Sequence, residues 1–386
     1  MIKRILLCLL VMIFGFTVEV HAEESLELTA KSAILMEAKS GTCIYEKEAD
    51  TKLSPASITK IMTLILIFDA LDEGKIHLND EVTTSAYAKS RGGSQVFLEE
   101  GEVQTVETMI KCIIIASAND ASVAMAEHLA GSEEEFVKKM NERAKGLGMK
   151  NTVFEDCCGL TDSKTHLTTA RDVAIMSREL ITHYPQIKNY STIWMDTIIH
   201  KTKQGEKEFG LSNTNKLLKM GTSFEVTGLK TGSTSLAKYC VSATGKKDGV
   251  ELIAVIMAAP DYKARFPEAK KLLDYGFSSC TYYKDEAMPK LASIPVTGGN
   301  LDSVELKYMG QFETISTKGE NFKSIEKKLE VEEKLIAPVK EGQKVGRLVY
   351  SLNGKEIGSV NICTKGAVEK AKFFDYFKQL VYIWGI

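Results

Sequence analysis

Two groups of short apolar runs predict β-strands on either side of a helical region. The strands are expected over 32–36, 42–46, 239–243 and 251–258, with another that begins at 226. Between and after them, apolar residues recur at the three- and four-residue spacing of helices. The helices are expected over 57–71, 106–116, 121–130, 133–147, 169–182 and 267–277. This order of elements predicts one mixed α+β domain over about 28–283.

The helix expected over 57–71 differs from the others because it is apolar on nearly every side. Ile58, Ile61 and Phe68 are among the side chains that leave it almost no polar face. A helix of this kind is expected to lie buried at the centre of its domain. Lys60 therefore needs a specific role there, because an unpaired buried charge is costly.

A second, smaller β domain is predicted over 286–365. The pattern changes there to short alternating segments, and Asn353-Gly354 lies between two of them, over 344–352 and 355–362. An Asn-Gly pair between alternating runs is a strong signal for a tight β-hairpin.

The last residues, 366–386, are predicted to form an amphipathic helix that lies on a membrane surface. Over 367–384 the aromatic residues fall largely on one side, and Lys370, Lys372 and Lys378 are available at its edges. Aromatic and basic residues arranged in this way are typical of interfacial helices. The alternative is a helix that docks on the β domain.

The N-terminal segment predicts export. Lys3 and Arg4 precede an apolar run over 5–16, and Val20 and Ala22 provide the small side chains that signal peptidase requires. We expect cleavage after Ala22, and a mature protein on the outer face of the cytoplasmic membrane, held there by the C-terminal helix. An uncleaved membrane-spanning anchor is the alternative, but the apolar run is shorter than the roughly 20 residues that cross a bilayer.

Composition and charge narrow the function classes. The 386 residues are 44% hydrophobic and 26% charged, which is ordinary for a globular protein and argues against long disordered regions. The 49 Lys and Arg residues nearly balance the 51 Asp and Glu residues, so nothing suggests binding to nucleic acid. The eight cysteines include no C-x-x-C pair, and neither a disulfide framework nor a metal site is predicted.

The most specific chemical signal lies at the start of the buried helix. Ser57 and Lys60 are three residues apart and therefore share one face of a helix. A serine hydroxyl becomes a good nucleophile only when a base accepts its proton, and a lysine can do this when burial and a second cation lower its pKa. The start of a helix also offers free backbone N–H groups to a developing oxyanion. By itself, a Ser-x-x-Lys spacing often occurs by chance.

Two further triplets make chance a poor explanation. Ser117-Ala118-Asn119 follows an apolar run at a break between expected helices, and Lys230-Thr231-Gly232 lies just before a strand. In this order and at this wide spacing, the three motifs resemble those of the penicillin-recognising serine peptidases. The resemblance is closest to the low-molecular-mass penicillin-binding proteins that act as D-alanyl-D-alanine carboxypeptidases, and it extends over about 28–386.

The resemblance implies a fold and a substrate. The fold is a β-lactamase-like α+β domain, with an antiparallel sheet and a mostly helical subdomain, followed by a small all-β domain and a terminal amphipathic helix. The substrate is a peptidoglycan stem peptide that ends in D-Ala-D-Ala. β-Lactam antibiotics are expected as covalent inhibitors, and no cofactor is expected.

The resemblance also implies a catalytic role for each of four residues. Ser57 attacks the penultimate carbonyl after Lys60 takes its proton. Ser117 relays a proton toward the leaving amine, and Asn119 holds Lys60 together with the substrate backbone. Water then hydrolyses the acyl-enzyme.

Five residues are expected to bind the substrate. They are Lys230, Thr231, Gly232, Ser233 and Arg265. Lys230 supplies the second cation and attracts the terminal carboxylate, the Thr231 hydroxyl donates to that carboxylate, and Gly232 lets the substrate lie against the strand edge. The backbone N–H groups of Ser57 and Ser233 form the oxyanion hole. Arg265 helps to bind the carboxylate, the alternative being a solvent-facing arginine at a helix start.

Two other features are expected to be structural. His166 resembles a histidine of the family, but no catalytic step requires it. Cys157-Cys158 is expected to pack within a loop, and redox sensing is the weaker alternative.

Two competing functions stay open at this point. A class A β-lactamase shares the three motif types but adds a Glu-x-x-Leu-Asn element that activates water, and no such element lies between Asn119 and Lys230. A cell-surface sensor that binds β-lactams or peptidoglycan without cleavage is the other, although a pure binder would not need Lys60 as a base.

Overall fold

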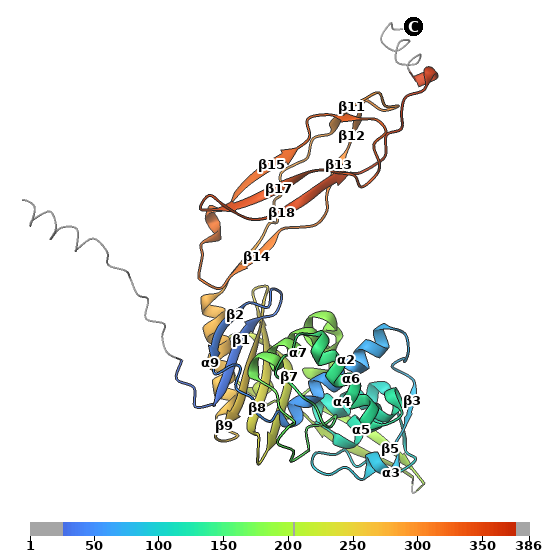
Figure 1. Cartoon of the computed structure of the whole chain (residues 1–386), viewed down its shortest axis with the longest axis vertical. Coiled ribbons are helices and arrows are strands. Elements are labelled where there is room, and N and C mark those ends of the chain that lie inside the picture. The colour runs from blue at the N-terminus through green and yellow to red at the C-terminus, as the bar shows by residue number, and fades with distance from the viewer. Residues whose placement is uncertain (1–25, 204, 376–386) are drawn as a thin grey trace, which may run out of the picture.

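The computed structural model describes residues 26–203 and 205–375, which form two domains (Figure 1). The predicted signal peptide, 1–22, lies outside the described residues, as do residues 376–386 of the predicted terminal helix. The first domain is mixed and the second is made almost entirely of strands, as the sequence predicts.

Five antiparallel strands form the sheet of the first domain, in the order β2-β1-β9-β8-β7. They are β1 (Ser32–Glu37), β2 (Cys43–Lys47), β7 (Glu225–Thr234), β8 (Lys238–Lys247) and β9 (Val250–Ala259). Strands β1 and β9 are buried on both faces along most of their length, which explains their continuous apolar runs. Among the described residues, no strand continues the sheet beyond β7, so the outer edge of β7 is open.

Helices cover both faces of this sheet (Figure 1). On one face, α9 (Arg265–Ser279) packs against the sheet and shares a core with Leu35 and Leu252. The other face carries the mostly helical subdomain. Its helices are α2 (Lys60–Asp72), α3 (Ala86–Lys89), α4 (Val106–Ile115), α5 (Asn119–Ala130), α6 (Glu133–Gly146), α7 (Ala170–His183) and α8 (Lys188–Ser191).

Side-chain caps fix where several of these helices begin. The hydroxyls of Thr105, Ser132 and Thr169 each accept a hydrogen bond from the backbone N–H three residues ahead. Thr105 is therefore the cap of α4, and Thr169 is the cap of α7.

The buried helix predicted over 57–71 is divided in two. A short 3-10 turn, η1 (Ala56–Thr59), carries Ser57, and α2 starts at Lys60. Nine of the side chains of α2 are buried, on all sides of the helix, as its apolar pattern predicts. Ser57 thus lies at the entrance of the central helix of the domain.

The β5–β6 hairpin has no counterpart in the sequence predictions. β5 (Met195–Thr202) pairs antiparallel with β6 (Gly205–Ser212). Most side chains of β6 are exposed, and on β5 burial alternates but the apolar Met195 and Ile199 are exposed while His200 is buried. The order of apolar and polar residues therefore does not mark these strands in the sequence. The remaining short elements are β3 (Glu81–Thr83), β4 (Val103–Thr105), η2 (Pro185–Ile187) and η3 (Lys216–Lys219).

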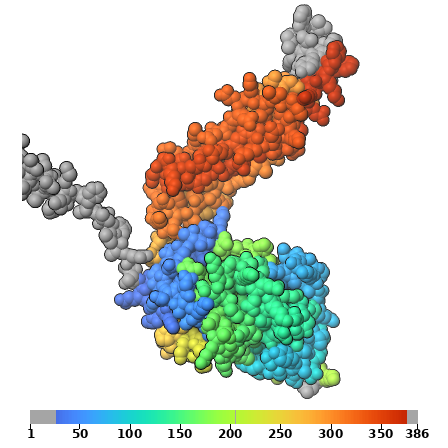
Figure 2. All heavy atoms as spheres, viewed as in Figure 1, coloured from blue at the N-terminus to red at the C-terminus, as the bar shows by residue number. Residues whose placement is uncertain are grey.

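The second domain is an elongated β structure that extends away from the first (Figure 2). Its strands are β11 (Ile294–Thr297), β12 (Ser303–Val304), β13 (Leu306–Tyr308), β14 (Glu313–Ser316), β15 (Glu326–Val331), β16 (Leu335–Ile336), β17 (Lys344–Leu352) and β18 (Lys355–Thr364), with the 3-10 turn η4 (Phe322–Ser324). β17 and β18 form the hairpin predicted around Asn353-Gly354, where both turn residues have positive φ.

A short strand joins the two domains. β10 (Thr281–Lys284) follows α9 and pairs antiparallel with β14 of the second domain. Lys39 on the first domain forms an ion pair with Glu313 on β14. The contact ties the two domains together next to the connecting strand.

The first residues of the terminal helix predicted over 366–386 are not helical. Val368 forms an isolated antiparallel bridge with Val339, and Lys370 forms one with Gly299, so this stretch is extended. The reason is packing, because Val368 is buried in the core of the β domain. Helical backbone starts at Phe373. In the part of the chain that the structure describes, no helix is both long enough and apolar enough to span a bilayer.

Candidate active site

The first turn of the central helix brings Ser57 and Lys60 together. The Lys60 Nζ lies 3.0 Å from the Ser57 Oγ, at hydrogen-bond distance. Ala56, directly before the serine, has a φ of 47°, in the left-handed region that alanine rarely adopts. The unusual backbone turns Ser57 toward the lysine, as positions of this kind at functional sites often do.

Lys60 is surrounded by acceptors. Its Nζ lies 2.6 Å from the Asn119 Oδ1 and 2.8 Å from the Cys158 carbonyl oxygen, in addition to Ser57. Burial lowers the pKa of Lys60, whose side chain is inaccessible to solvent. A neutral amine has two N–H donors and one lone pair. When the two carbonyl oxygens take both donors, the lone pair is left for the Ser57 hydroxyl proton.

A break between two helices supplies Ser117 and Asn119. α4 ends at Ile115, Ser117 has a φ of 60°, and α5 starts at Asn119, two residues earlier than predicted. The Asn119 Nδ2 donates to the Gly92 carbonyl over 2.7 Å, so its Oδ1 is oriented toward Lys60. The break therefore gives Ser117 and Asn119 different partners.

Lys230 is the second cation of the site. It lies on β7, is 1% exposed, and its Nζ donates to the Ser117 Oγ over 2.8 Å and to the Thr231 carbonyl over 3.0 Å. Burial is the main cause that lowers the pKa of Lys230 well below its ordinary value, and the charges of Lys60 and Arg265 add to it. The structure thus contains two hydrogen-bonded pairs of side chains, Ser57 with Lys60 and Ser117 with Lys230.

The edge strand β7 closes the site from the other side. A Cβ on Gly232 would lie 2.7 Å from the Pro55 carbonyl oxygen and 3.0 Å from the backbone nitrogen of Ile58, so only glycine allows β7 to approach η1 this closely. The exposed Ser233 follows. The Thr231 hydroxyl donates to the Thr214 Oγ1 over 2.7 Å. An extended ligand could pair with the open edge of β7 beside Ser57.

Arg265 does not join the side-chain network of the two lysines. It starts α9, is 9% exposed, and its Nη1 donates to the carbonyl oxygens of Gly232 and Cys240, each over 3.2 Å. Burial lowers its pKa as well. The solvent-facing alternative is wrong, because the guanidinium is buried and supports β7 at Gly232.

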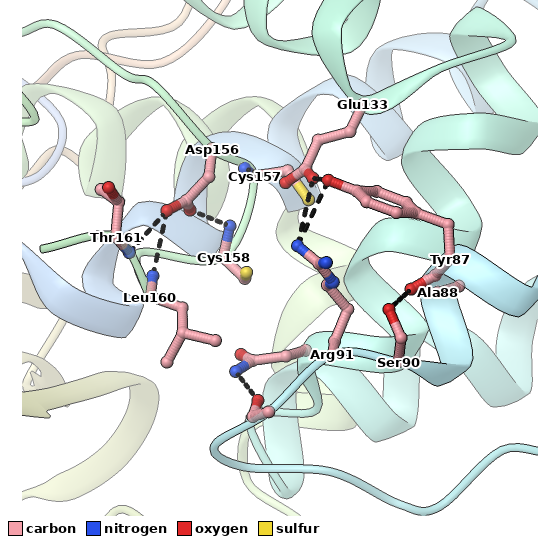
Figure 3. A network of polar contacts seen from close by, with 12 residues as sticks. Tyr87, Ala88, Ser90, Arg91, Glu133, Asp156, Cys157, Cys158, Leu160 and Thr161 are labelled. Carbon is pink, nitrogen blue, oxygen red and sulfur yellow. Dashed lines mark hydrogen bonds and ion pairs between the residues drawn. The ribbon is translucent and has the colours of Figure 1, made fainter. Parts of the chain in front are cut away.

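A loop that the sequence analysis left without a catalytic role holds Lys60 in place. The Asp156 carboxylate accepts hydrogen bonds from the backbone N–H groups of four residues of the loop, several of which appear in Figure 3: Cys158, Gly159, Leu160 and Thr161. These bonds tighten the loop, and the Cys158 carbonyl reaches Lys60. The Cys158 carbonyl could not be predicted, because a backbone acceptor leaves no signature in the residue type.

His166 and Cys157 fix the same loop to the central helix. The neutral imidazole suits its contacts, because Nδ1 accepts the Glu155 N–H over 3.0 Å and Nε2 lies 2.9 Å from the Thr59 Oγ1. Burial lowers the pKa of His166. The Cys157 carbonyl accepts the Thr63 hydroxyl over 2.5 Å. The contacts of His166 agree with the structural role predicted for it.

Comparisons with known proteins agree with this geometry. A family model described as D-alanyl-D-alanine carboxypeptidase matches residues 18–261, and a model described as the C-terminal domain of penicillin-binding protein 5 matches residues 277–370. D-alanyl-D-alanine carboxypeptidase DacF of Bacillus subtilis is 40% identical over 394 residues, which cover 99% of each chain.

A second relative and a solved structure are also similar to this chain. D-alanyl-D-alanine carboxypeptidase DacC of Escherichia coli is 36% identical, over 92% of this chain and 88% of its own. Penicillin binding protein 5 from Haemophilus influenzae superposes with a TM-score of 0.69 at 33% identity, over 89% of this chain and 98% of that one. These matches confirm the fold and the family that the three motifs predict. The chain belongs to the D-alanyl-D-alanine carboxypeptidase family of serine peptidases.

Proposed function

We propose that this enzyme removes the terminal D-alanine from peptidoglycan stem peptides through an acyl-enzyme on Ser57. The observation that carries the proposal is the position of the Lys60 Nζ, 3.0 Å from the Ser57 Oγ and within reach of two carbonyl oxygens. In the neutral state, the amine can accept the serine proton without losing its other hydrogen bonds.

The remaining residues complete the reaction. As Ser57 attacks the penultimate carbonyl, the backbone N–H groups of Ser57 and Ser233 stabilise the oxyanion, a contribution typically worth about 3 to 4 kcal/mol per donor. Ser117, hydrogen-bonded to Lys230, gives its proton to the leaving amine and takes up the proton that Lys60 received from Ser57, so Lys60 becomes neutral again. Water then attacks the ester, with Lys60 again as the base.

The substrate carboxylate is expected to bind next to Lys230. Thr231 can redirect its hydroxyl from Thr214 to the carboxylate, and Lys230 attracts the negative charge. Arg265 is 33 residues from Gly232 in sequence but donates to its carbonyl. Its positive charge near β7 favours the same anion, while its hydrogen bonds hold the strand.

The proposal is tested by measuring D-alanine release from diacetylated Lys-D-Ala-D-Ala. We expect release by the wild-type chain and a loss of roughly 10³-fold or more in the Ser57→Ala variant, since the nucleophile is gone. Ser278→Ala, on the exposed face of α9, is the matched control and should keep full activity. Mass spectrometry after incubation with penicillin should find one stable adduct, on Ser57.

Each alternative gives a different result in the same experiment. A stable penicillin adduct without D-alanine release would favour the non-hydrolytic sensor. Rapid turnover of penicillin without an adduct would favour a β-lactamase.

We further propose that the enzyme is exported and attaches to the outer face of the membrane through its C-terminal segment. Export is supported by the sequence of the first 22 residues. Attachment is supported by Phe373 and Phe374, which are 77% and 75% exposed at the end of the β domain and precede further aromatic residues.

A further inference from the structure

Three metal-ligating side chains meet beside the active site without a role in acyl transfer. Cys157 and Cys158 are adjacent in the loop that carries the Lys60 acceptor, and Glu133 is the first residue of α6. Their Sγ and carboxylate oxygen atoms all lie within 4.8 Å of one another (Figure 3). The three residues are at most 9% exposed.

This donor set suits a thiophilic divalent cation. Two thiolates and a carboxylate are ligands that Zn²⁺ and its heavier relative Cd²⁺ accept in tetrahedral sites, with a water in the fourth position. A Zn–S bond of about 2.3 Å places two sulfur ligands about 3.8 Å apart. The side chains therefore need to close by only about 1 Å to coordinate an ion.

The surrounding charges balance such an ion. Arg91 lies 4.0 Å from the Glu133 carboxylate, so two thiolates, one carboxylate, one divalent cation and one guanidinium sum to zero charge. The carboxylate is already oriented, because its Oε2 accepts the Tyr87 hydroxyl over 2.7 Å and its Oε1 accepts the Cys157 N–H over 3.0 Å. Each oxygen keeps a second lone pair for a metal.

The side chains on the outer side of the cluster are partly exposed to solvent. Tyr87 is 45% exposed, and the Arg91 side chain is 28% exposed. Figure 3 shows these two side chains next to Glu133, on the side away from Asp156. A rotation of the long Arg91 side chain would open Glu133 to solvent.

We propose that Glu133, Cys157 and Cys158 bind a thiophilic divalent cation of the Zn²⁺ class, and that the bound ion slows acylation of Ser57. As each metal–sulfur bond forms, the thiol gives up its proton to solvent, and no redox step is involved. Coordination draws Cys157 and Cys158 toward Glu133. Since their carbonyl oxygens bind Thr63 and Lys60, the movement disturbs the position of the general base.

The sequence did not reveal this site because its ligands are not arranged in a local motif. Glu133 is 24 residues away from Cys157 in the chain. Only the fold, in which α6 begins next to the loop, brings the carboxylate to the adjacent thiols.

Cadmium titration of the full-length chain tests the site directly. Cd²⁺–thiolate bonds give a charge-transfer absorption in the ultraviolet, and we expect it to saturate at one equivalent. Cys157→Ser and Cys158→Ser should abolish the band, and Glu133→Gln should weaken binding about tenfold or more. Cys43→Ser, at an exposed thiol, and Cys240→Ser, at a buried thiol on β8, are matched controls and should leave the band unchanged.

The effect on the enzyme is measured as the rate of penicillin acylation with and without added Zn²⁺. We expect Zn²⁺ to slow acylation at least severalfold in the wild type and in Cys43→Ser, but not in Cys158→Ser or Glu133→Gln. A band that survives both loop substitutions, or that disappears in Cys43→Ser, would overturn the site. If the Cd²⁺ band is complete but added Zn²⁺ does not change the rate of acylation, the proposal that the bound ion slows acylation is wrong. Because the band does not depend on turnover, these outcomes remain distinct from a failure of the proposed carboxypeptidase function.

Discussion

Two buried lysines face two serines in this site, and the pairs differ in what they can do. Lys60 is bounded by Asn119 and the Cys158 carbonyl, which leaves one direction for a proton to arrive, from Ser57. Lys230 borders Ser117 and lies on the strand where a substrate would pair. The positive charge of one lysine makes protonation of the other less favourable. The state in which one of the two lysines is neutral is therefore favoured.

The lowered pKa of Lys60 makes acylation depend on pH. Burial favours the neutral amine, so the midpoint of its titration lies below the ordinary value of 10.5. Because only the neutral amine accepts the Ser57 proton, we expect the rate of penicillin acylation to rise with pH through that midpoint and then level off. Stopped-flow measurements of the acylation rate, across the pH range in which the protein stays folded, would record this rise.

Lys60→Arg is the matched variant for the pH profile. A guanidinium keeps the positive charge but cannot lose its proton, so acylation should fall by about 10²- to 10⁴-fold, the usual contribution of a general base. Thermal unfolding serves as the check that the variant is folded. Acylation that is independent of pH, or that survives in Lys60→Arg, would contradict the role given to Lys60.

At the scale of single residues, the sequence could identify the side chains proposed to react but not all of the groups that hold them. Two contacts join the motif residues, one between Lys60 and Ser57 and one between Lys230 and Ser117. Residue type carried that information, because a nucleophile and a base must be particular side chains. Cys158 acts through its carbonyl and Asp156 through the shape of a loop, so neither role depends on a pattern that can be read along the chain.

At the scale of elements, the site depends on how closely β7 approaches the turn η1. Gly232 touches Pro55 and Ile58 without room for a side chain. The register of β7 with β8 places Gly232 opposite Cys240, and Arg265 binds the carbonyl oxygens of both. The distance between Ser57 and the open edge of β7 therefore depends on Gly232 and on the buried Arg265.

Gly232→Ala should open this gap. The added methyl would press on the Pro55 carbonyl and push β7 outward, so we expect penicillin acylation to fall by roughly 10²-fold, the order of loss that a misplacement of about 1 Å can cause. Gly210→Ala is a matched control, also at a strand glycine, where a Cβ meets nothing within 4 Å. Equal acylation by both variants would contradict the close approach.

Element boundaries were predictable where burial was periodic. β1, β9, α4 and α7 have apolar faces and lie within two residues of their expected positions. The β5–β6 hairpin was missed because β6 is largely exposed and because β5 exposes the apolar Met195 while it buries His200. The helix predicted over 57–71 is divided because Ala56 has a left-handed backbone conformation, and a short 3-10 turn that carries Ser57 precedes α2. A local departure of this kind from a regular helix is expected at a functional site.

At the scale of the whole molecule, the β domain lies between the catalytic domain and residues 373–375, the last that the structure describes (Figure 1). The first domain meets it through β10 and the ion pair of Lys39 with Glu313. At the other end, Val368 is fixed in its core, and exposed aromatic residues follow. The order of the two domains follows from the sequence, but the extended backbone at Val368 depends on its long-range pairing with Val339.

Truncation of the chain after Lys372 should release the enzyme from membranes. The cut retains the buried Val368, so the β domain keeps its core, while Phe373 and the residues after it are lost. We expect the truncated protein in the soluble fraction with unchanged D-alanine release from a soluble peptide. Vesicle flotation measures the same property on the purified mature protein.

A double variant, Phe373→Ser with Phe374→Ser, is the companion to the truncation and keeps the full chain length. Partial release is expected, because two exposed aromatic rings are removed while the rest of the segment is retained. Membrane binding that persists after truncation would assign attachment to the N-terminal segment instead.

The elongated β domain has a consequence for where in the cell wall the enzyme can work. If its far end is held at the membrane, the catalytic domain stands at a fixed height above the lipid, and only stem peptides that reach this layer meet Ser57. The length of the domain then sets the distance between the membrane and the active site, and substrates are selected by their depth in the wall, independently of their chemistry. Lengthening or shortening it would move the zone of trimming without altering a single residue of the active site.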